Sequence, residues 1–240
     1  MGLHKVQDRF LKRKKKQIFK NCDHDRGFCN CRKKFHILIK KVKANIPKQY
    51  LELTWKDLDH PQIQQDKKNI KKYVKNIEKF YDRGFGIWLH GQPGLGKTTL
   101  GTFILGAAIK KGFEVHYIEF QEALDLYTAK WNKSGIEKEN IENKFNKKIL
   151  YRDFLLLDNL GRETRTKINL KALEKIIRFR TNNGLPTIFT SNLSIKKFCN
   201  RYGNNYKNNN GDVLFSLLSS SVKTVKLEGF DYRRKVLKAD

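Results

Sequence analysis

The sequence predicts an α/β protein with a central parallel sheet flanked by helices, preceded by a small, basic, helical region that contains cysteines. Two observations lead to this fold class. From residue 84 onward, short apolar runs alternate with helical patterns, which is the order of βαβ units in a parallel sheet. Before residue 84, lysine and arginine dominate and a cysteine cluster spans residues 22–31. We therefore expect two parts, a basic N-terminal region over residues 1–83 and an α/β domain over residues 84–240.

The N-terminal region opens with a helical pattern, because Leu3, Val6 and Phe10 recur at helical spacing ahead of the basic run Lys12–Lys16. It holds 24 Lys and Arg against 9 Asp and Glu, whereas residues 84–240 hold 27 against 15. The formal net charge of +27 suits a polyanionic partner such as nucleic acid. Composition weakens this indication, since 38 of the 51 basic residues are lysine and an AT-rich coding sequence yields the same bias.

The remaining elements follow in order along the chain. Residues 50–55 are expected to form a loop, and residues 63–80 an amphipathic helix that leads into the first strand. Apolar runs predict strands over residues 85–90, 113–119, 153–158, 186–190 and 222–227. Helical periodicity predicts helices over residues 97–111, 121–132, 168–182, 194–202 and 212–221. The polar segment 135–148 is expected as a loop or a short exposed helix.

The chain offers no candidate for a membrane span or a secretory signal. Its longest apolar run, Phe103–Ile109, is far shorter than the roughly 18 residues that a span needs. The basic N-terminus lacks the apolar stretch of a signal peptide. We therefore expect a cytoplasmic protein without a membrane partner. In a reducing cytoplasm, four cysteines favour metal ligands or buried thiols over disulfides.

A glycine-rich loop between the first expected strand and helix predicts a phosphate-binding site. Its sequence is Gly91-Gln92-Pro93-Gly94-Leu95-Gly96-Lys97-Thr98-Thr99. In the pattern G-x-x-x-x-G-K-[ST], glycines let backbone N–H groups turn onto phosphate oxygens, and the helix N-terminus adds its positive dipole end. Lys97 is expected to reach the β- and γ-phosphates, and the Thr98 hydroxyl to bind Mg²⁺. The expected ligand is a nucleoside triphosphate with Mg²⁺.

Polar residues follow two further apolar runs. Asp158 ends the run that begins at Phe154, and we expect it beside Mg²⁺ at the carboxyl end of a buried strand. Asn159 comes next, where many ATPases of this build carry a second acid that activates water. Because an amide cannot accept that proton, and losing a general base costs on the order of 10²- to 10⁴-fold in rate, hydrolysis should be slow. Glu163 would substitute only if its loop folded back.

Asn192 follows the expected strand 186–190 at the same edge of the sheet. Its amide can sense the γ-phosphate by hydrogen bonding, although a serine and an asparagine after a strand also form ordinary turns.

These motifs, in this order and spacing, resemble the AAA+ ATPases of the DnaC/IstB class. The resemblance covers about residues 85–235 and rests on five blocks, Gly91–Thr98, Leu155–Gly161, Ile176–Arg180, Pro186–Leu193 and Gly229–Arg233. It implies an AAA+ domain that binds ATP, with Asn192 as sensor 1 and Arg233 as the sensor 2 arginine. The class comprises helicase loaders and the ATP-dependent helpers of transposases.

The resemblance implies a replication protein that loads the replicative hexameric DNA helicase onto single-stranded DNA. The N-terminal region would dock on the helicase, and self-assembly on DNA is a further expectation. We expect DNA contacts at Lys196 and Lys197, just beyond sensor 1. The alternatives are an IstB-type transposition helper, which would prefer duplex DNA, and a non-catalytic adaptor in which ATP is structural.

A second departure from the class lies near the C-terminus. Leu217 stands where the class segment carries an arginine that reaches a neighbouring subunit's nucleotide, a contact worth roughly 10³- to 10⁵-fold in rate. Arg201 is a candidate replacement. With Asn159, this change favours a weak ATPase.

The cysteine cluster offers a candidate metal site. Cys22, His24, Cys29, Cys31 and His36 lie close together in sequence, and four of them would suffice for Zn²⁺. Their spacing is not the paired C-x-x-C, so reduced, unliganded thiols stay open as the other interpretation. Some loaders carry a cysteine-rich element before the ATPase domain, and that resemblance favours zinc at Cys22, His24, Cys29 and Cys31.

Overall fold

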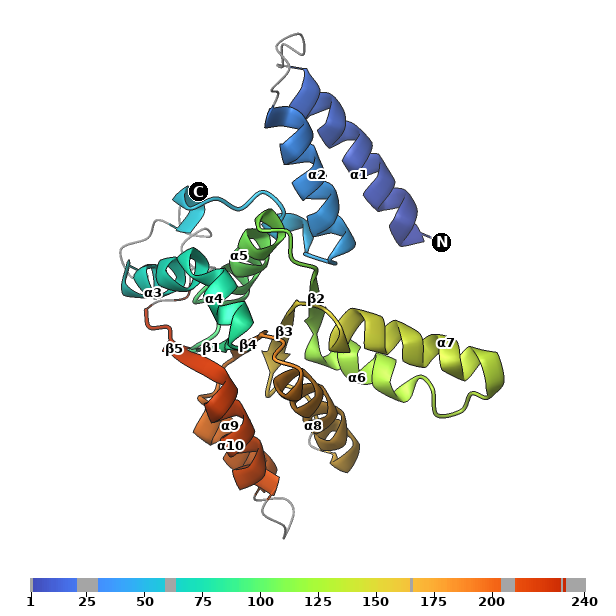
Figure 1. Ribbon diagram of the computed structural model, residues 1–240, viewed down its shortest axis with the longest axis vertical. Helices are drawn as coiled ribbons and strands as arrows, with labels where there is room; N and C mark the ends of the chain where they lie inside the picture. Colours follow the sequence, from blue (N-terminus) through green and yellow to red (C-terminus); the bar gives the residue numbers. More distant parts are fainter. Residues whose placement is uncertain are drawn as a thin grey trace.

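The structure is a computed structural model that describes residues 2–20, 30–58, 64–164, 166–203, 210–229 and 231. Helices cover both faces of a five-stranded sheet (Figure 1). A pair of helices, α1 and α2, lies side by side at one end of the molecule. No helix in this part of the chain is long and apolar enough to cross a membrane.

All strands of the sheet are parallel, and their order is β2-β3-β4-β1-β5. The strands are β1 (Gly86–His90), β2 (Val115–Glu119), β3 (Phe154–Leu160), β4 (Thr187–Ser191) and β5 (Val222–Lys226). Because parallel strands end at the same edge, the loops that follow β1, β3 and β4 lie close together there. The register places Glu119 opposite Asp158, and an irregularity between Leu157 and Leu160 interrupts the pairing of β3 with β4.

The helices divide between the two faces of the sheet. The first group is α1 (Gly2–Phe19), α2 (Asn30–Lys43), α3 (Gln64–Lys75), α4 (Ile77–Asp82) and α5 (Lys97–Lys110), with 3₁₀ turns η2 (Lys48–Tyr50) and η3 (Lys56–Leu58). The second group is α6 (Phe120–Thr128), α7 (Gly135–Phe145), the π-helical segment η5 (Asn146–Leu150), α8 (Lys167–Asn182), α9 (Ile195–Gly203) and α10 (Asn210–Ser221).

Each face of the sheet has its own hydrophobic cluster, since successive strand residues point to opposite sides. Ile87, Leu156 and Ile188 face α2, α3 and α5, whereas Trp88 and Phe189 face α6, α8, α9 and α10. The first cluster also contains residues that precede 84, such as Leu38, Ile70 and Tyr73. The boundary expected between residues 83 and 84 stays a prediction, but side chains from both sides of it share one core.

Two sequence expectations need correction. The single helix expected over residues 63–80 is split into α3 and α4, because the backbone turns at Asn76 with φ −110° and ψ 25°. Helix α2 had no counterpart among the expected elements, although its buried residues Leu38 and Val42 recur at helical spacing. Its many lysines concealed this narrow apolar stripe. The expected alternation of strands and helices after residue 84 is otherwise confirmed.

Candidate nucleotide-binding site

The glycine-rich loop Gly91–Thr99 connects β1 in the sheet to the N-terminus of α5. Gly94 and Gly96 adopt left-handed backbone conformations, with φ of 81° and 77°. A Cβ on Gly94 would lie only 1.8 Å from Oδ1 of Asp231, so a side chain here would displace the Asp231 carboxylate as well as strain the left-handed backbone. Leu95 is buried in the core and anchors the loop. The result is a cradle of exposed backbone at a helix N-terminus, which suits an anion.

Lys97 folds back over this loop. Its Nζ donates hydrogen bonds to the carbonyl oxygens of Gly91 at 2.8 Å and Gln92 at 2.7 Å. The ammonium group is therefore held at the mouth of the cradle, where it can meet a phosphate.

Asp158 lies at the carboxyl end of β3 and is only 1 % exposed. Its carboxylate accepts hydrogen bonds from three hydroxyl groups on three different elements. Thr98 Oγ1 in α5 lies 3.0 Å and 3.1 Å from the two carboxylate oxygens, and Tyr117 in β2 donates to Oδ2 at 2.9 Å. Thr190 in β4 donates to Oδ1. Burial and the nearby Asp158 raise the pKa of Tyr117, so its hydroxyl remains a donor.

The donor chemistry of this site fits Mg²⁺. Carboxylate and hydroxyl oxygens are hard ligands, and Mg²⁺ in nucleotide sites is held by one or two carboxylates together with phosphates. Within the described ranges, no group of three or more His, Cys, Asp or Glu side chains could hold a metal ion. A site built from Thr98, Asp158 and bound phosphates needs no such cluster.

The backbone conformation at position 159 favours asparagine. Its φ is 63°, a left-handed conformation in which asparagine and aspartate are enriched among non-glycine residues. Its backbone N–H donates to Thr190 Oγ1 at 3.0 Å, so Thr190 joins Asp158 and Asn159 in one network. The irregularity between β3 and β4 lies at this residue.

The segment after β4 is tied to both neighbouring strands. Ser191 Oγ donates to the Leu160 carbonyl at 2.8 Å, and Trp88 Nε1 donates to the Leu193 carbonyl at 3.0 Å. Asn192 lies between these anchored residues and is exposed at the same sheet edge as the glycine-rich loop. Its position is compatible with the sensor 1 prediction.

Three residues considered for hydrolysis have structural roles. Glu163 accepts the Gly161 N–H at 2.7 Å, and Arg201 Nη1 donates to the Gly161 carbonyl, so both stabilise the loop after β3. Leu217 in α10 packs against the second hydrophobic cluster. An arginine there would have to leave this apolar environment.

The other predicted site residues fall into two groups. Lys196 and Lys197 are exposed on α9. Arg233, Cys22, His24 and Cys29 lie outside the described residues.

Cys31 differs from its prediction. It is disulfide-bonded, whereas the sequence favoured a metal ligand or a reduced thiol. The thiolate is the form that binds metals, so the described part of the cluster gives no support to zinc.

Sequence reasoning missed Tyr117, Thr190 and Asp231. All three meet the site only because distant segments converge on it. For Tyr117 and Thr190, a hydroxyl group within a predicted strand was the available signal, but the strand register that directs it to Asp158 is a tertiary property.

The sequence profile of a family described as IstB-like ATP binding protein matches residues 33–238. The chain belongs to the IstB-like ATP-binding proteins. The predicted DnaC/IstB class is thereby confirmed.

Solved structures share the fold of this IstB-like protein. The crystal structure of DnaI is 20% identical, with a TM-score of 0.59 over 78% of this chain and 93% of that chain. The DnaC helicase loader is 24% identical, with a TM-score of 0.59 over 76% and 100%. Replication initiator DnaA bound to AMPPCP and single-stranded DNA is 19% identical, with a TM-score of 0.57 over 80% and 54%. These likenesses confirm the AAA+ P-loop fold. No curated protein sequence matches the chain.

Proposed function

We propose that this IstB-like protein binds ATP with Mg²⁺ and helps to load the replicative hexameric DNA helicase onto single-stranded DNA in the cytoplasm. The observation that carries the proposal is the site formed by the Gly91–Thr98 loop and Asp158, in a fold shared with the DnaC helicase loader. Self-assembly on DNA belongs to the same proposal.

Each part of the site has a separate role toward ATP. Backbone N–H groups of the loop would hold the phosphates, and Lys97 would offset their negative charge. Thr98 and Asp158 would hold Mg²⁺, which neutralises charge between the phosphates when bound. Asn192 and Arg233 would report on the nucleotide as sensors 1 and 2.

Hydrolysis is expected to be slow. Asn159 cannot act as a general base, and Glu163 is engaged with the Gly161 N–H. Leu217 is partly buried against the second hydrophobic cluster, and Arg201 donates a hydrogen bond to the Gly161 carbonyl of its own chain. ATP would then act chiefly as a ligand that stabilises one conformation. This suits a loader whose affinity for DNA changes once in each loading event.

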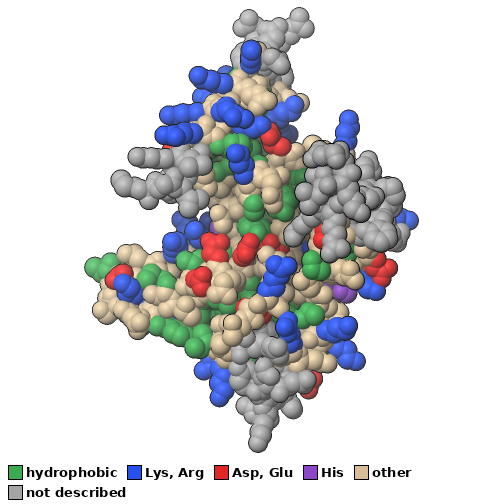
Figure 2. All heavy atoms as spheres, turned by 180° about the vertical axis from the view of Figure 1, so that it is seen from behind, with side chains coloured by type: hydrophobic (Ala, Val, Ile, Leu, Met, Phe, Trp, Pro, Cys, Tyr) green, Lys and Arg blue, Asp and Glu red, His purple; other side chains and the backbone are tan. Residues whose placement is uncertain are grey.

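The distribution of charge supports a nucleic-acid partner. Figure 2 shows that Lys and Arg side chains gather over the end of the molecule formed by α1 and α2. Lys196 and Lys197 add exposed charge on α9, close to Asn192. Among the solved relatives, DnaC is described as a helicase loader and a DnaA structure contains single-stranded DNA.

Native mass spectrometry of the protein mixed with the host's replicative helicase, with and without ATP, would test the proposal. A stoichiometric complex with a helicase hexamer is the expected result. Lys97→Ala should reduce the effect of ATP on the complex, and adding single-stranded DNA should reveal self-assembly. Absence of a complex under every nucleotide condition would contradict helicase loading.

The family itself favours a second candidate, an IstB-type transposition helper. Such a protein would bind duplex DNA more tightly than single strands and would recruit a transposase. Comparing the affinities for matched duplex and single-stranded oligonucleotides separates the two functions.

A third candidate, a non-catalytic adaptor with structural ATP, is supported by the residues at positions 159 and 217. It predicts a helicase complex with no turnover at any stage of loading.

A further inference from the structure

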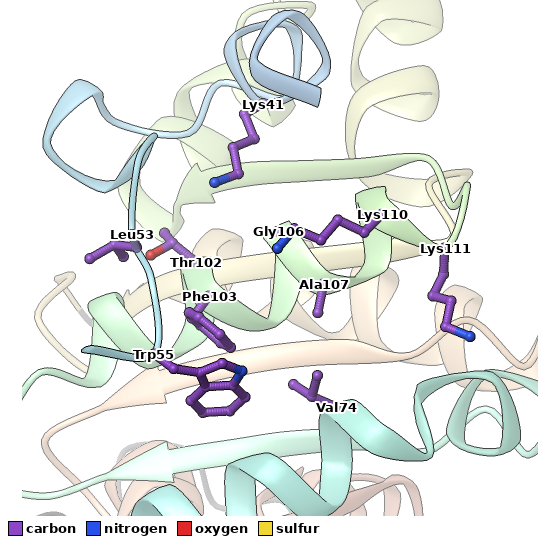
Figure 3. A pocket seen from close by; sticks show the side chains of 10 residues that line it. All are labelled: Lys41, Leu53, Trp55, Val74, Thr102, Phe103, Gly106, Ala107, Lys110 and Lys111. Carbon is purple, nitrogen blue, oxygen red and sulfur yellow. The ribbon is translucent and has the colours of Figure 1, made fainter. Parts of the chain in front are cut away.

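A pocket of about 300 Å³ lies beside α5, away from its N-terminus (Figure 3). Helix α2, helix α3 and the segment Leu53–Trp55 complete its walls. Gly106, in its floor, is nine residues beyond Lys97, so it lies roughly 13 Å along the helix from the glycine-rich loop. The pocket is therefore separate from the nucleotide-binding site. Its lining consists of Lys41, Leu53, Trp55, Val74, Thr102, Phe103, Gly106, Ala107, Lys110 and Lys111.

A buried lysine points into this pocket from α2. Lys41 is only 8 % exposed, and its Nζ donates one hydrogen bond, to the Leu51 carbonyl at 2.5 Å. The amine lies over Gly106, since a Cβ built there would be 3.6 Å from Nζ. No carboxylate in the described ranges forms an ion pair with Lys41. Burial and the nearby Lys110 lower the pKa of Lys41 to about 8, although the Glu52 carboxylate, which forms an ion pair with Lys14, partly opposes this shift.

The other charges of the pocket are also positive. Lys110 extends along α5 toward Gly106 in Figure 3 and, like Lys41, has no ion pair with the described part of the chain. Lys111 is paired with the exposed carboxylate of Glu78 at 3.0 Å. A buried ammonium group without a counter-ion is costly. An anion bound between Lys41 and Lys110 would remove that cost.

An aromatic pair forms the opposite wall. The rings of Trp55 and Phe103 have centroids 4.2 Å apart, and Lys71 Nζ lies 5.5 Å from the Trp55 centroid. Leu53, Val74 and Ala107 make this side of the pocket apolar. The planes of the two rings are tilted by 53°, so the pocket joins a positive site to an angled aromatic and apolar wall. Cations next to aromatic rings are the usual means by which proteins hold single-stranded nucleic acid.

We propose that this pocket binds one nucleotide unit, with its phosphate between Lys41 and Lys110 and its base against Trp55 and Phe103. The volume lies at the lower end of the range for ligand pockets, which suits one nucleotide rather than a longer segment. The choice of a nucleotide rests on the proposed function, because a DNA-loading protein meets single strands. A free mononucleotide and a unit of single-stranded DNA share this chemistry.

Fluorescence anisotropy with a labelled oligo(dT) tests the proposal on the full chain. Trp55→Leu should weaken binding about 5- to 100-fold, the effect of losing one stacked base. Lys41→Met and Lys110→Gln should each lower the slope of log affinity against log salt by about 0.7. Lys68→Gln, at an exposed α3 lysine outside the pocket lining, is the matched control and should leave stacking intact. Because Lys110 is exposed, its variant remains informative even if Lys41→Met unfolds.

Unlabelled dTMP separates the two sources of the ligand. Displacement of oligo(dT) by dTMP, lost in Trp55→Leu, identifies a free mononucleotide as sufficient. If oligo(dT) stays bound in the presence of dTMP while the pocket variants still weaken oligo(dT) binding, the ligand is a unit of single-stranded DNA. Pocket variants that bind oligo(dT) as Lys68→Gln does would overturn the proposal.

Parallel measurement of the helicase complex distinguishes failure here from failure of the proposed function. If the pocket variants lose the helicase complex but bind oligo(dT) as before, the pocket holds an acidic segment of a protein partner and the nucleotide proposal is wrong. Weakened oligo(dT) binding in a protein that never binds the helicase would support the pocket and contradict the loader.

Discussion

The three hydroxyl groups around Asp158 hydrogen-bond to its buried carboxylate and thereby fix its position. Of the three donors, Tyr117 also contacts the N-terminal region. Its backbone N–H donates to the Ala44 carbonyl at 2.8 Å. Asn45 also donates to the Tyr117 carbonyl, at 3.3 Å. A single strand residue therefore joins the segment after α2 to the proposed Mg²⁺ ligand.

Tyr117→Phe should weaken Mg²⁺-dependent ATP binding roughly 3- to 10-fold, because it removes one hydrogen bond to a charged oxygen while leaving the ring packed. Binding of a fluorescent ATP analogue, titrated with Mg²⁺ and repeated in EDTA, measures the effect. Tyr151→Phe, at a tyrosine that is 59 % exposed, is the control. Equal losses with and without Mg²⁺ would show that Tyr117 acts only on packing.

Asn159→Asp should raise ATP turnover by about 100-fold or more if the rest of the site is competent, since it restores a general base. Aspartate tolerates the left-handed backbone at this position, with φ of 63°. Asn159→Ala is the control and should stay slow. Steady-state phosphate release measures both. Unchanged turnover in Asn159→Asp would refute this explanation of slow hydrolysis. Leu217→Arg is a poor second substitution, because Leu217 is partly buried against the second hydrophobic cluster.

His116 in β2 should make the fold sensitive to acid. Burial, Lys148 and Arg152 lower its pKa from 6.5 to about 3, and its Nε2 has no hydrogen-bond partner in the described chain. Between these values the folded state binds fewer protons than the unfolded state, so stability falls as the pH drops below 6.5. At pH 5 the loss should be about 2 kcal/mol.

Urea unfolding at pH 7 and pH 5 checks this expectation. His116→Leu should reduce the difference between the two free energies of unfolding, whereas His36→Leu, at an exposed histidine, should preserve it. An unchanged pH dependence in His116→Leu would assign the acid sensitivity to other groups.

At the scale of elements, Arg180 of α8 joins the starts of β3 and β4. It is fully buried, and burial lowers its pKa to about 9. Its guanidinium donates to Thr187 Oγ1 and to the carbonyl oxygens of Ile149, Leu150, Arg152, Asp153 and Pro186. One side chain thereby satisfies backbone acceptors at the end of η5 and at the entrances to two strands.

Arg180→Met should lower the free energy of unfolding by about 3–5 kcal/mol, because it leaves several buried carbonyl groups without donors. Arg178→Met, two residues earlier on the exposed side of α8, should change it by less than about 0.5 kcal/mol. Chemical denaturation of the two variants provides the comparison. A similar small loss in both would show that water replaces the guanidinium.

The elements also show where periodicity succeeds. Strands β1 and β3 are nearly continuous apolar runs because both of their faces are covered, and β4 is buried along its whole length. The sequence predicts all three within a few residues. The break at Asn76 between α3 and α4 leaves no comparable signal, since apolar residues continue on both sides of it.

At the scale of the whole molecule, the N-terminal region is part of the sheet's own core. Leu38, Ile70 and Tyr73 pack in the cluster that contains Ile87 and Ile104, and the Tyr73 hydroxyl donates to the Phe85 carbonyl at 2.8 Å. A fragment of residues 84–240 would expose this face of the sheet. Each large apolar side chain removed from the core costs roughly 1.5–3 kcal/mol.

We therefore expect residues 84–240 alone to lack a cooperative thermal transition, whereas residues 30–240 retain one. Circular dichroism during heating distinguishes the two fragments. If residues 84–240 unfold cooperatively at the temperature of the full chain, the boundary between residues 83 and 84 separates two independent domains after all.

The local sequence was sufficient for the parallel sheet, the phosphate cradle and Asp158, because each depends on a short pattern whose chemistry is local. Apolar runs predict buried strands, and glycines before Lys97 and Thr98 predict an exposed helix N-terminus. The partners of Asp158, the pocket around Lys41 and the shared core of residues 38–77 depend on strand order and helix docking. Those contacts join residues that lie far apart along the chain, so only the tertiary structure decides them.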